Sequence, residues 1–323
     1  MKVVPGVRAL ADDFDVFLLD MWGVMHDGHR PYDGVLDVIQ QLKAAGKRLV
    51  ILSNSSKRQD NSVKMLRKLG FDPEDFELII TSGEVAYQML GGKDSPLPTE
   101  PKSWPMLNDL ADQKAVVLGS GDGDAEYLQS CGWKLSNAAE SSLVVARGTF
   151  TVNDGSSVVH KREDANGYEV ALTKMLEACA ARHLPMLVTN PDKIRPDAER
   201  PPMPGKIGDA YEAALKRHGV PNPSALVKRI GKPFPDVYEM SLAGDIDKTR
   251  VCMVGDALET DVTGGTLAGI STVWVIMDGI HSPDVKDLEG GANVVQEFNA
   301  ISQETYAGGQ ILQPDYLMAN FRW

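Results

Sequence analysis

The chain has 323 residues, 43% of them hydrophobic and 24% charged, with a formal net charge of −12 and a sequence pI near 5.0. This composition is typical of a folded globular protein and excludes an intrinsically disordered chain, while the length favours two domains over one compact core. The acidic balance argues against a nucleic-acid partner, which would need a basic face, so we expect no nucleic-acid binding.

Targeting segments and cysteine usage indicate the compartment. Residues 1–15 are interrupted by proline and charged side chains and do not resemble a signal peptide. No apolar run approaches the roughly 18 residues that span a bilayer, so we expect no membrane partner. Cys131, Cys179 and Cys252 are widely spaced and odd in number, which indicates buried thiols in a reducing compartment rather than disulfides or a zinc site. We therefore expect a cytoplasmic protein.

The first strong strand signal is residues 16–24, with the sequence VFLLDMWGV. Four apolar residues run directly into Asp20, and such a run, ended by turn residues, predicts a strand buried on both faces of a parallel sheet. Asp20 then lies at the carboxyl end of the strand, where open α/β sheets bind their ligands. Burying a lone carboxylate is costly, so Asp20 should meet a metal, a basic group or a substrate, unless it only caps the next turn.

A crossover unit follows this strand. Apolar residues at helical spacing predict a helix over 35–42, and residues 48–52 predict a second buried strand. A strand, a helix and a strand at this spacing form a right-handed crossover, so the two strands are parallel. The cluster SNSS at 53–56 therefore lies at the same sheet edge as Asp20. Hydroxyls and exposed backbone N–H groups there suit an oxyanion such as phosphate, although the same residue types also begin ordinary helices.

The middle of the chain predicts an inserted unit. After a third strand and a further helix, residues 91–101 are dense in glycine and proline and indicate a linker. A new α/β series follows. We expect strands at 115–118, 142–146 and 185–189, and a long amphipathic helix at 168–181 between the last two. A proline-rich loop over 190–204 then returns the chain to the first unit. We predict a core of residues 1–100 and 201–323, with 101–200 as the inserted domain.

A later apolar strand repeats the design of the first. It also ends in an acidic turn, which places Asp256 and Asp261 at the same sheet edge as Asp20. Shortly before it, Lys232 stands in the segment GKP, ahead of a short helix. From residue 303 onward the sequence predicts no regular element.

Asp20, Asp256 and Asp261 supply three carboxylates at the ends of two parallel strands. Such a cluster repels itself unless a cation is present, and an all-oxygen set of ligands suits Mg²⁺. Lys232 adds a fixed positive charge. A nucleophilic carboxylate, a hard cation, a lysine and hydroxyl donors together fit phosphoryl transfer through an aspartyl phosphate. Each residue alone has an ordinary explanation as a turn aspartate or a surface lysine, but their order and spacing together do not.

In these motifs the chain resembles the haloacid dehalogenase-like (HAD) hydrolase superfamily, and within it subfamily IIA, the NagD and 4-nitrophenylphosphatase-like branch. The matched motifs are DMWGV at 20–24, SNSS at 53–56, GKP at 231–233, GD at 255–256 and TD at 260–261. The segment TNPD at 189–192 resembles the return from cap to core in that branch. The resemblance covers about residues 14–285 and implies a doubly wound, Rossmann-like parallel-sheet core with an inserted α/β cap domain that selects the substrate.

The resemblance also implies catalytic and substrate-binding roles. Asp20 would be the nucleophile, and Lys232 would steady both the nucleophile and the charge of the intermediate. Ser53, Asn54 and Ser55 would bind the phosphoryl group. The substrate would be a small-molecule phosphate ester, and members of this branch often form a homodimer through the cap.

A Mg²⁺ site is implied by the same resemblance. Asp20 and Asp256 would bind the ion through carboxylate oxygens, and Trp22 would bind it through its backbone carbonyl. Asp261 would hold metal-bound water or Lys232.

One position departs from the family pattern. Phosphatases of this superfamily carry a second aspartate two residues after the nucleophile, which protonates the leaving group and then activates water. Here that residue is Trp22, whose side chain cannot transfer a proton. General acid–base catalysis is worth about 10²–10⁴-fold, so we expect weak turnover of alkyl phosphates or a need for an acidic leaving group. His26 and Asp27 lie in the same loop and are candidates to replace the missing group.

Two functions follow from this pattern. The first is a Mg²⁺-dependent phosphatase-type hydrolase with an impaired or altered acid–base step, which the intact Asp20, Lys232 and Asp256 favour. The second is a catalytically impaired family member that binds a phosphorylated ligand or a protein partner, which Trp22 favours.

Overall fold

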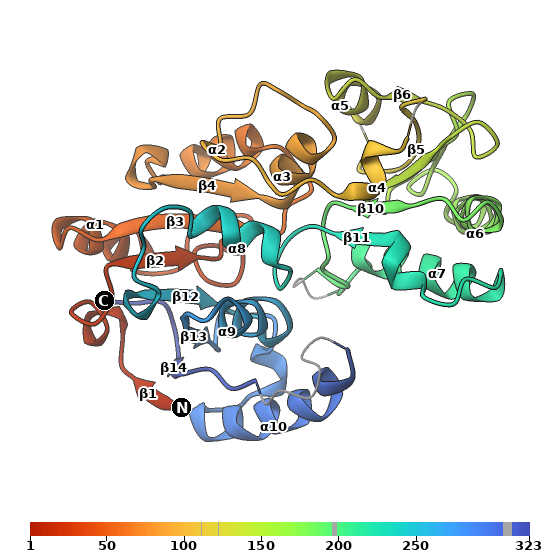
Figure 1. The fold of residues 1–323 in the computed structure, drawn as a ribbon. Helices are drawn as coiled ribbons and strands as arrows, with labels where there is room; N and C mark the ends of the chain where they lie inside the picture. Colours follow the sequence, from red (N-terminus) through yellow and green to blue (C-terminus); the bar gives the residue numbers. More distant parts are fainter. Residues whose placement is uncertain (111, 122, 196–198, 306–311) are drawn as a thin grey trace.

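The computed structural model describes residues 1–110, 112–121, 123–195, 199–305 and 312–323, and it contains two β-sheets with helices packed against them (Figure 1). The two ends of the chain form the first sheet, and the middle of the chain forms the second. Among the described helices, none is long and apolar enough to cross a membrane. The three cysteines are buried and form no disulfide, as expected from their spacing.

The first sheet is parallel throughout and has the strand order β1-β14-β13-β12-β2-β3-β4. Its strands are β1 (Lys2–Val4), β2 (Val16–Leu19), β3 (Arg48–Ser53), β4 (Leu78–Thr81), β12 (Val251–Gly255), β13 (Ser271–Val275) and β14 (Tyr316–Met318). Every residue of β2 and of β12 is buried, which explains their continuous apolar sequences. Because β2 and β12 are parallel neighbours, with Leu19 opposite Val254, both strands end at the same edge of the sheet.

Helices cover both faces of this sheet. Phe17 and Leu19 of β2 share an apolar cluster with α1, whereas Leu18 points to the opposite face and packs in a second cluster with Val85 and Val237. The helices of this unit are α1 (Val35–Ala44), α2 (Gln59–Lys68), α3 (Ser82–Met89), α8 (Pro235–Ser241), α9 (Thr263–Ala268) and α10 (Leu288–Thr305). The predicted doubly wound α/β architecture is therefore confirmed.

The second sheet has the order β11-β10-β7-β5-β8-β9, with β6 beside β5. Its strands are β5 (Lys114–Gly119), β6 (Lys134–Leu135), β7 (Leu143–Ala146), β8 (Thr151–Asn153), β9 (Val158–His160), β10 (Met186–Val188) and β11 (Val227–Arg229). Its helices are α4 (Pro105–Asn108), α5 (Asp124–Ser130), α6 (Ala165–Ala181) and α7 (Pro204–Arg217). One face packs on α6 and α7, and the other joins the apolar cluster of α3 and α8 in the first unit.

The end of the inserted unit differs from the boundary expected at residue 201. β11 pairs in parallel with β10, and α7 shares the apolar cluster of α6, so both belong with the second sheet (Figure 1). The described residues of the proline-rich loop before α7 contact the first unit, for example through the hydrogen bond between Asn54 and Asp192 and that from Arg200 to the carbonyl of Ile280, but α7 itself belongs with the second sheet. The expectation erred because an amphipathic helix does not reveal which sheet it covers. We propose instead an inserted domain from about residue 101 to 229.

The C-terminal tail, for which the sequence predicts no element, completes the first sheet. β14 lies between β1 and β13, with Leu317 opposite both Val3 and Trp274. Residues 306–311 of this tail lie outside the described residues. A strand of three residues is too short to produce a readable alternation, which is why the sequence pattern missed it.

Candidate active site

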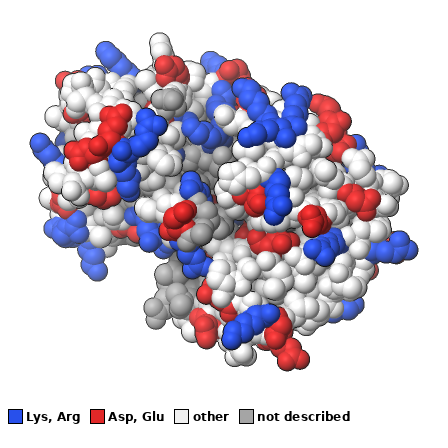
Figure 2. All heavy atoms as spheres, turned by 180° about the vertical axis from the view of Figure 1, so that it is seen from behind, with Lys and Arg blue, Asp and Glu red and all other residues white. Residues whose placement is uncertain are grey.

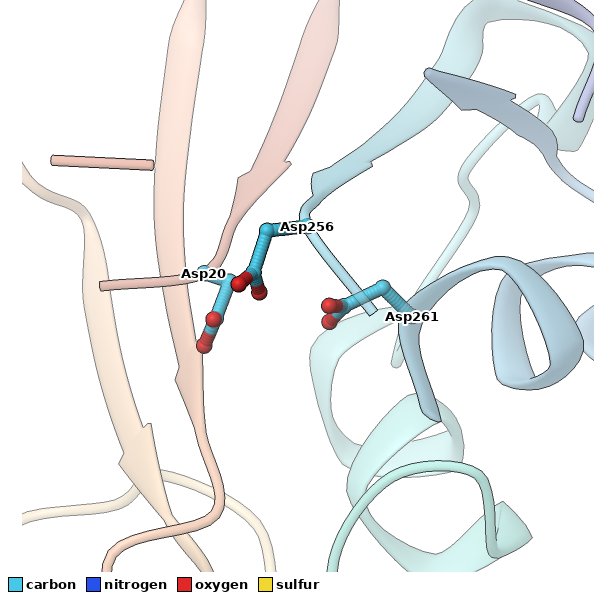
Figure 3. A group of neighbouring side chains, drawn as sticks. All are labelled: Asp20, Asp256 and Asp261. Atoms are coloured by element: carbon cyan, nitrogen blue, oxygen red, sulfur yellow. The ribbon is translucent and has the colours of Figure 1, made fainter. Parts of the chain in front are cut away.

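Three carboxylates meet at the carboxyl edge of the first sheet. Asp20 directly follows β2, and its backbone N–H donates to Val254 of the neighbouring strand (2.9 Å). Asp256 directly follows β12, and Asp261 lies in the turn of π-helix that comes next, η5 (Leu258–Val262). Figure 3 shows the three side chains pointing toward one another, and one oxygen from each lies within 4.8 Å of the others. The structure therefore brings together the three acidic residues selected from the sequence.

Two glycines permit this close approach. Gly23 has a φ of +82°, and a Cβ built on it would lie 2.1 Å from Oδ2 of Asp256. A Cβ on Gly255 would lie 2.1 Å from the side chain of Asp261. Any side chain at either position would displace a carboxylate, so the glycines of the DMWGV and GD motifs have a steric function here.

Lys232 is the counter-charge of this cluster. Its side chain is 2% exposed, and its Nζ lies 2.6 Å from Oδ1 of Asp20 and 2.7 Å from Oδ1 of Asp261. Burial alone would lower the pKa of Lys232, but the two carboxylates outweigh burial and raise it above its usual value. The lysine is therefore protonated, and one ammonium group can balance only one of the three carboxylates, so full ionisation of the cluster would leave two negative charges without compensation.

This imbalance fits a divalent cation. Burial, followed by repulsion from Asp20 and Asp261, raises the pKa of Asp256 well above its usual range. Burial also raises the pKa of Asp261 to about 6, although Lys232 acts in the opposite direction. Three carboxylates on two strand ends form a hard-oxygen donor set, which suits Mg²⁺. The residues present thus fit the metal site that the resemblance implies.

The segment after β3 faces the same cavity, but its side chains are differently engaged. The side-chain amide of Asn54 accepts from the backbone N–H of Lys232 (2.7 Å) and donates to its carbonyl (3.0 Å) and to Oδ1 of Asp192 (2.7 Å). Ser53 Oγ accepts from the backbone N–H of Ser55 (3.3 Å). The Asn54 side chain therefore positions Lys232, and the serine hydroxyls remain the better candidates to bind a phosphoryl oxygen.

Trp22 turns its indole ring onto the loop that follows it. A Cβ on Gly28 would lie 2.6 Å from the indole ring, so the ring packs closely against a backbone that has no side chain there. The ring of His26 packs beside it, with 6.0 Å between the ring centroids. Trp22 also lines the cavity, and its side chain provides no acid or base there.

The two substitutes suggested by the sequence are poorly suited to replace it. Nδ1 of His26 accepts a hydrogen bond from the backbone N–H of Gly28 (2.9 Å), and burial lowers the pKa of the imidazole, so the ring is neutral. Asp27 is absent from the described lining of the cavity. Its carboxylate instead accepts from the backbone N–H groups of His29 and Arg30 (both 2.8 Å).

A cavity of about 740 Å³ adjoins the carboxylates and is lined by both units. Asp20, Lys232 and Asp256 are among its lining residues. Apolar and cationic side chains form much of the remaining wall, namely Met21, Met65, Ile194, Met203, Ile280, Phe298, Lys57, Lys193 and Arg195. Figure 2 shows the surface hollowed between the two units, with Lys and Arg side chains along the hollow.

Two contributors to the site were missed by sequence reasoning. The backbone N–H of Ile280 donates to Oδ2 of Asp256 (2.8 Å), and no sequence signal identifies such a backbone donor. Asp192 lines the cavity from the inserted unit and accepts a hydrogen bond from Asn54. The resemblance assigns the segment TNPD only to the return from cap to core, although an aspartate after an Asn-Pro turn is a usable signal for a site residue.

Comparisons with known proteins agree with this geometry. Residues 17–134 match a family model described as haloacid dehalogenase-like hydrolase, and residues 229–300 match a second HAD-hydrolase-like model. The chain is 30% identical to human chronophin over 268 residues, which cover 80% of each chain. It is 25% identical to a 4-nitrophenylphosphatase of Schizosaccharomyces pombe, covering 90% of this chain and 92% of that one. A Cytophaga hutchinsonii structure, described as a possible sugar phosphatase, shares the fold with a TM-score of 0.70 at 19% identity, covering 99% and 98% of the two chains.

Proposed function

Because the chain belongs to the haloacid dehalogenase-like hydrolase family, we propose that it is a Mg²⁺-dependent phosphatase that hydrolyses a small phosphorylated metabolite through an aspartyl phosphate on Asp20. The observation that carries this proposal is the environment of that carboxylate. Asp20 lines the cavity, 2.6 Å from the Lys232 ammonium, and one of its oxygens lies within 4.8 Å of an oxygen from each of Asp256 and Asp261.

The first step is attack by Asp20 on phosphorus. Lys232 holds one of its oxygens, Oδ1, which fixes the carboxylate and leaves the other oxygen to form the bond. The same ammonium would stabilise the negative charge of the phosphoryl group, and the hydroxyls of Ser53 and Ser55, two residues that line the cavity, would bind its oxygens. In the second step water attacks the aspartyl phosphate and regenerates the Asp20 carboxylate.

The proposed metal site consists of Asp20, Asp256 and the backbone carbonyl of Trp22, with Asp261 acting through water. When bound, Mg²⁺ would neutralise charge on the phosphoryl oxygens during both steps. The buried carboxylates themselves support this assignment, since their charge exceeds what Lys232 compensates.

The acid–base step is the part of the proposed mechanism that would differ from the family pattern. Trp22 cannot protonate a leaving group, so a substrate whose leaving group is already acidic should be hydrolysed fastest unless another residue supplies the proton. The substrate itself would be selected by the inserted domain, because residues 190–195 of that domain line the cavity opposite the sheet edge.

A direct test is Mg²⁺-dependent hydrolysis of 4-nitrophenyl phosphate by the wild-type chain and by Asp20→Asn. We expect turnover in the wild type that requires the metal and is lost in the variant, with both proteins folded by circular dichroism. Trp22 favours a second candidate function, in which the protein binds a phosphorylated ligand without hydrolysing it. No turnover across a broad panel of phosphate esters, with ligands that still raise the melting temperature, would establish that alternative.

A further inference from the structure

The proposed reaction needs a proton for the leaving group, and the titratable side chains that line the cavity can be considered in turn. Asp20 is the nucleophile, and Lys232 and Asp256 belong to the charged cluster around it. Glu259 pairs with His281 (2.8 Å), which overcomes the effect of burial and lowers the pKa of the glutamate, so it is ionised and has no proton to give. His26 is neutral, with Nδ1 already accepting a hydrogen bond. Among the acidic residues described in the lining, Asp192 is the one that remains.

The loop that carries Asp192 holds it firmly. Its backbone N–H donates to Oδ1 of Asn190 (2.8 Å), and its carbonyl accepts from the backbone N–H of Gly205 (2.9 Å). A Cβ on Gly205 would lie 2.0 Å from the carbonyl oxygen of Pro191, so the loop packs closely against the start of α7. The carboxyl group is therefore held on a supported backbone rather than on a free loop tip.

Asp192 is connected to the nucleophile through Asn54 and Lys232, with hydrogen bonds at the backbone of the lysine and an ion pair at its Nζ. Oδ1 of Asp192 accepts from Nδ2 of Asn54 (2.7 Å), and the Asn54 amide is bonded to both backbone groups of Lys232. The ammonium group of Lys232 in turn contacts Asp20. Because Asp192 comes from the inserted unit and Asp20 from the sheet edge, the two carboxyl groups approach the cavity from opposite units.

The charge state of Asp192 suits a group that both gives and takes a proton. Burial raises its pKa to about 7, although the hydrogen bond from Asn54 and the charge of Lys232 act to lower it. The carboxylates of Asp20 and Asp261 raise it further. An acid–base catalyst works best when its pKa lies near the operating pH.

We propose that Asp192 is the general acid and base of this enzyme, taking over the function of the aspartate that the family carries at position 22. This inference rests on the proposed phosphatase function. As Asp20 attacks phosphorus, the bond to the ester oxygen breaks with its electron pair on that oxygen, and the Asp192 carboxyl group transfers its proton there to form the alcohol. Water then attacks the aspartyl phosphate, the Asp192 carboxylate takes a proton from it, and the phosphorus–Asp20 bond breaks to release phosphate and restore both residues.

The test compares Asp192→Asn with the wild type on three aryl phosphates of increasing leaving-group acidity: phenyl, 4-nitrophenyl and 2,4-dinitrophenyl phosphate. Asparagine keeps an oxygen to accept from Asn54 but has no proton to transfer. We expect kcat/KM for phenyl phosphate to fall about 10²-fold or more, and that for 2,4-dinitrophenyl phosphate to stay within about threefold of the wild type. Asp27→Asn, which alters a carboxyl group outside the described cavity lining, is the matched control and should preserve the wild-type dependence on leaving group.

A second readout needs no variant. In the wild type, kcat/KM for phenyl phosphate should fall as pH rises through about 7, because Asp192 loses the proton that it must donate. The charged groups facing it are Lys232, Asp20 and Asp261, and the adjacent Lys193 is paired with Asp209 (2.8 Å). The 2,4-dinitrophenyl ester, which needs no proton, should lack this alkaline decline.

Two results would overturn the inference and leave the phosphatase proposal standing. One is an equal fall in kcat/KM for all three esters in Asp192→Asn, which would mean that Asp192 only positions Asn54. The other is an unchanged rate on phenyl phosphate. A wild-type chain that hydrolyses none of the three esters with Mg²⁺ present would instead overturn the phosphatase function, and with it this inference.

Discussion

Replacing Lys232 with methionine tests the charge balance on which the site depends. The methionine side chain has a similar length, so the change removes the ammonium and leaves Asp20 and Asp261 without their counter-charge at 2.6 and 2.7 Å. Removing one partner of a buried ion pair costs about 3–5 kcal/mol. Lys232 is 2% exposed and contacts two carboxylates, so we expect the free energy of unfolding to fall by an amount in the upper part of that range at pH 8 without metal.

The assay is urea unfolding of Lys232→Met and wild type, at pH 5 and pH 8, with EDTA or Mg²⁺. Because Asp261 titrates at a pKa of about 6, the cluster carries less charge at pH 5, and the destabilisation should be smaller there. Mg²⁺ should recover part of the loss at pH 8. Lys102→Met is the control, since Lys102 pairs with Glu239 but is 78% exposed, and it should change stability by no more than about 1 kcal/mol. An equal loss for Lys232→Met at both pH values would refute the counter-charge role.

Three further predictions follow from the same site. Gly23→Ala places a Cβ 2.1 Å from Oδ2 of Asp256 at a φ of +82°, so it should destabilise the protein by about 1–3 kcal/mol and weaken Mg²⁺ binding, as thermal unfolding with Mg²⁺ titration would measure. The pKa of Asp261 is raised from 3.8 to about 6, so between these pH values the metal-free native state binds more protons than the unfolded chain. The native state therefore loses stability as the pH rises through this range. Mg²⁺ should raise the melting temperature more at pH 8 than at pH 5, and an equal rise at the two pH values would contradict this prediction. Trp22→Asp should restore phenyl phosphate hydrolysis in the Asp192→Asn background by about tenfold or more, and a folded double variant without recovery would count against an acid–base role at position 22.

Much of the candidate site could be read from the sequence because its residues sit at the ends of buried parallel strands. An apolar run identifies each strand, and the crossover rule brings the strand ends to one edge, which is how Asp20 and Asp256 were placed together. The family motifs then identified Lys232, whose contacts with Asp20 depend on a segment far away in the sequence. In this part of the chain, the apolar runs that identify the strands and the crossover rule that orders them lead to the same site.

The rest depends on contacts that no local pattern encodes. α7 and β11 were assigned to the wrong unit because amphipathic periodicity identifies an apolar face but not the sheet that it covers. The direction of the Trp22 ring is decided by the missing side chain of Gly28, six residues away. Asp192 lies in a loop of the inserted unit, and its proximity to Asn54 follows from how the two units are packed.

The proposed mechanism requires Asp20 to carry the phosphoryl group during turnover. The most direct test is to mix the Mg²⁺-loaded wild-type chain with 4-nitrophenyl phosphate bearing a radiolabelled phosphoryl group, stop the reaction with acid, and map the label by peptide digestion. We predict an acid-stable, hydroxylamine-sensitive label on the peptide that contains Asp20, and none in Asp20→Asn. Turnover without such a label, or a label on a different residue, would contradict the account.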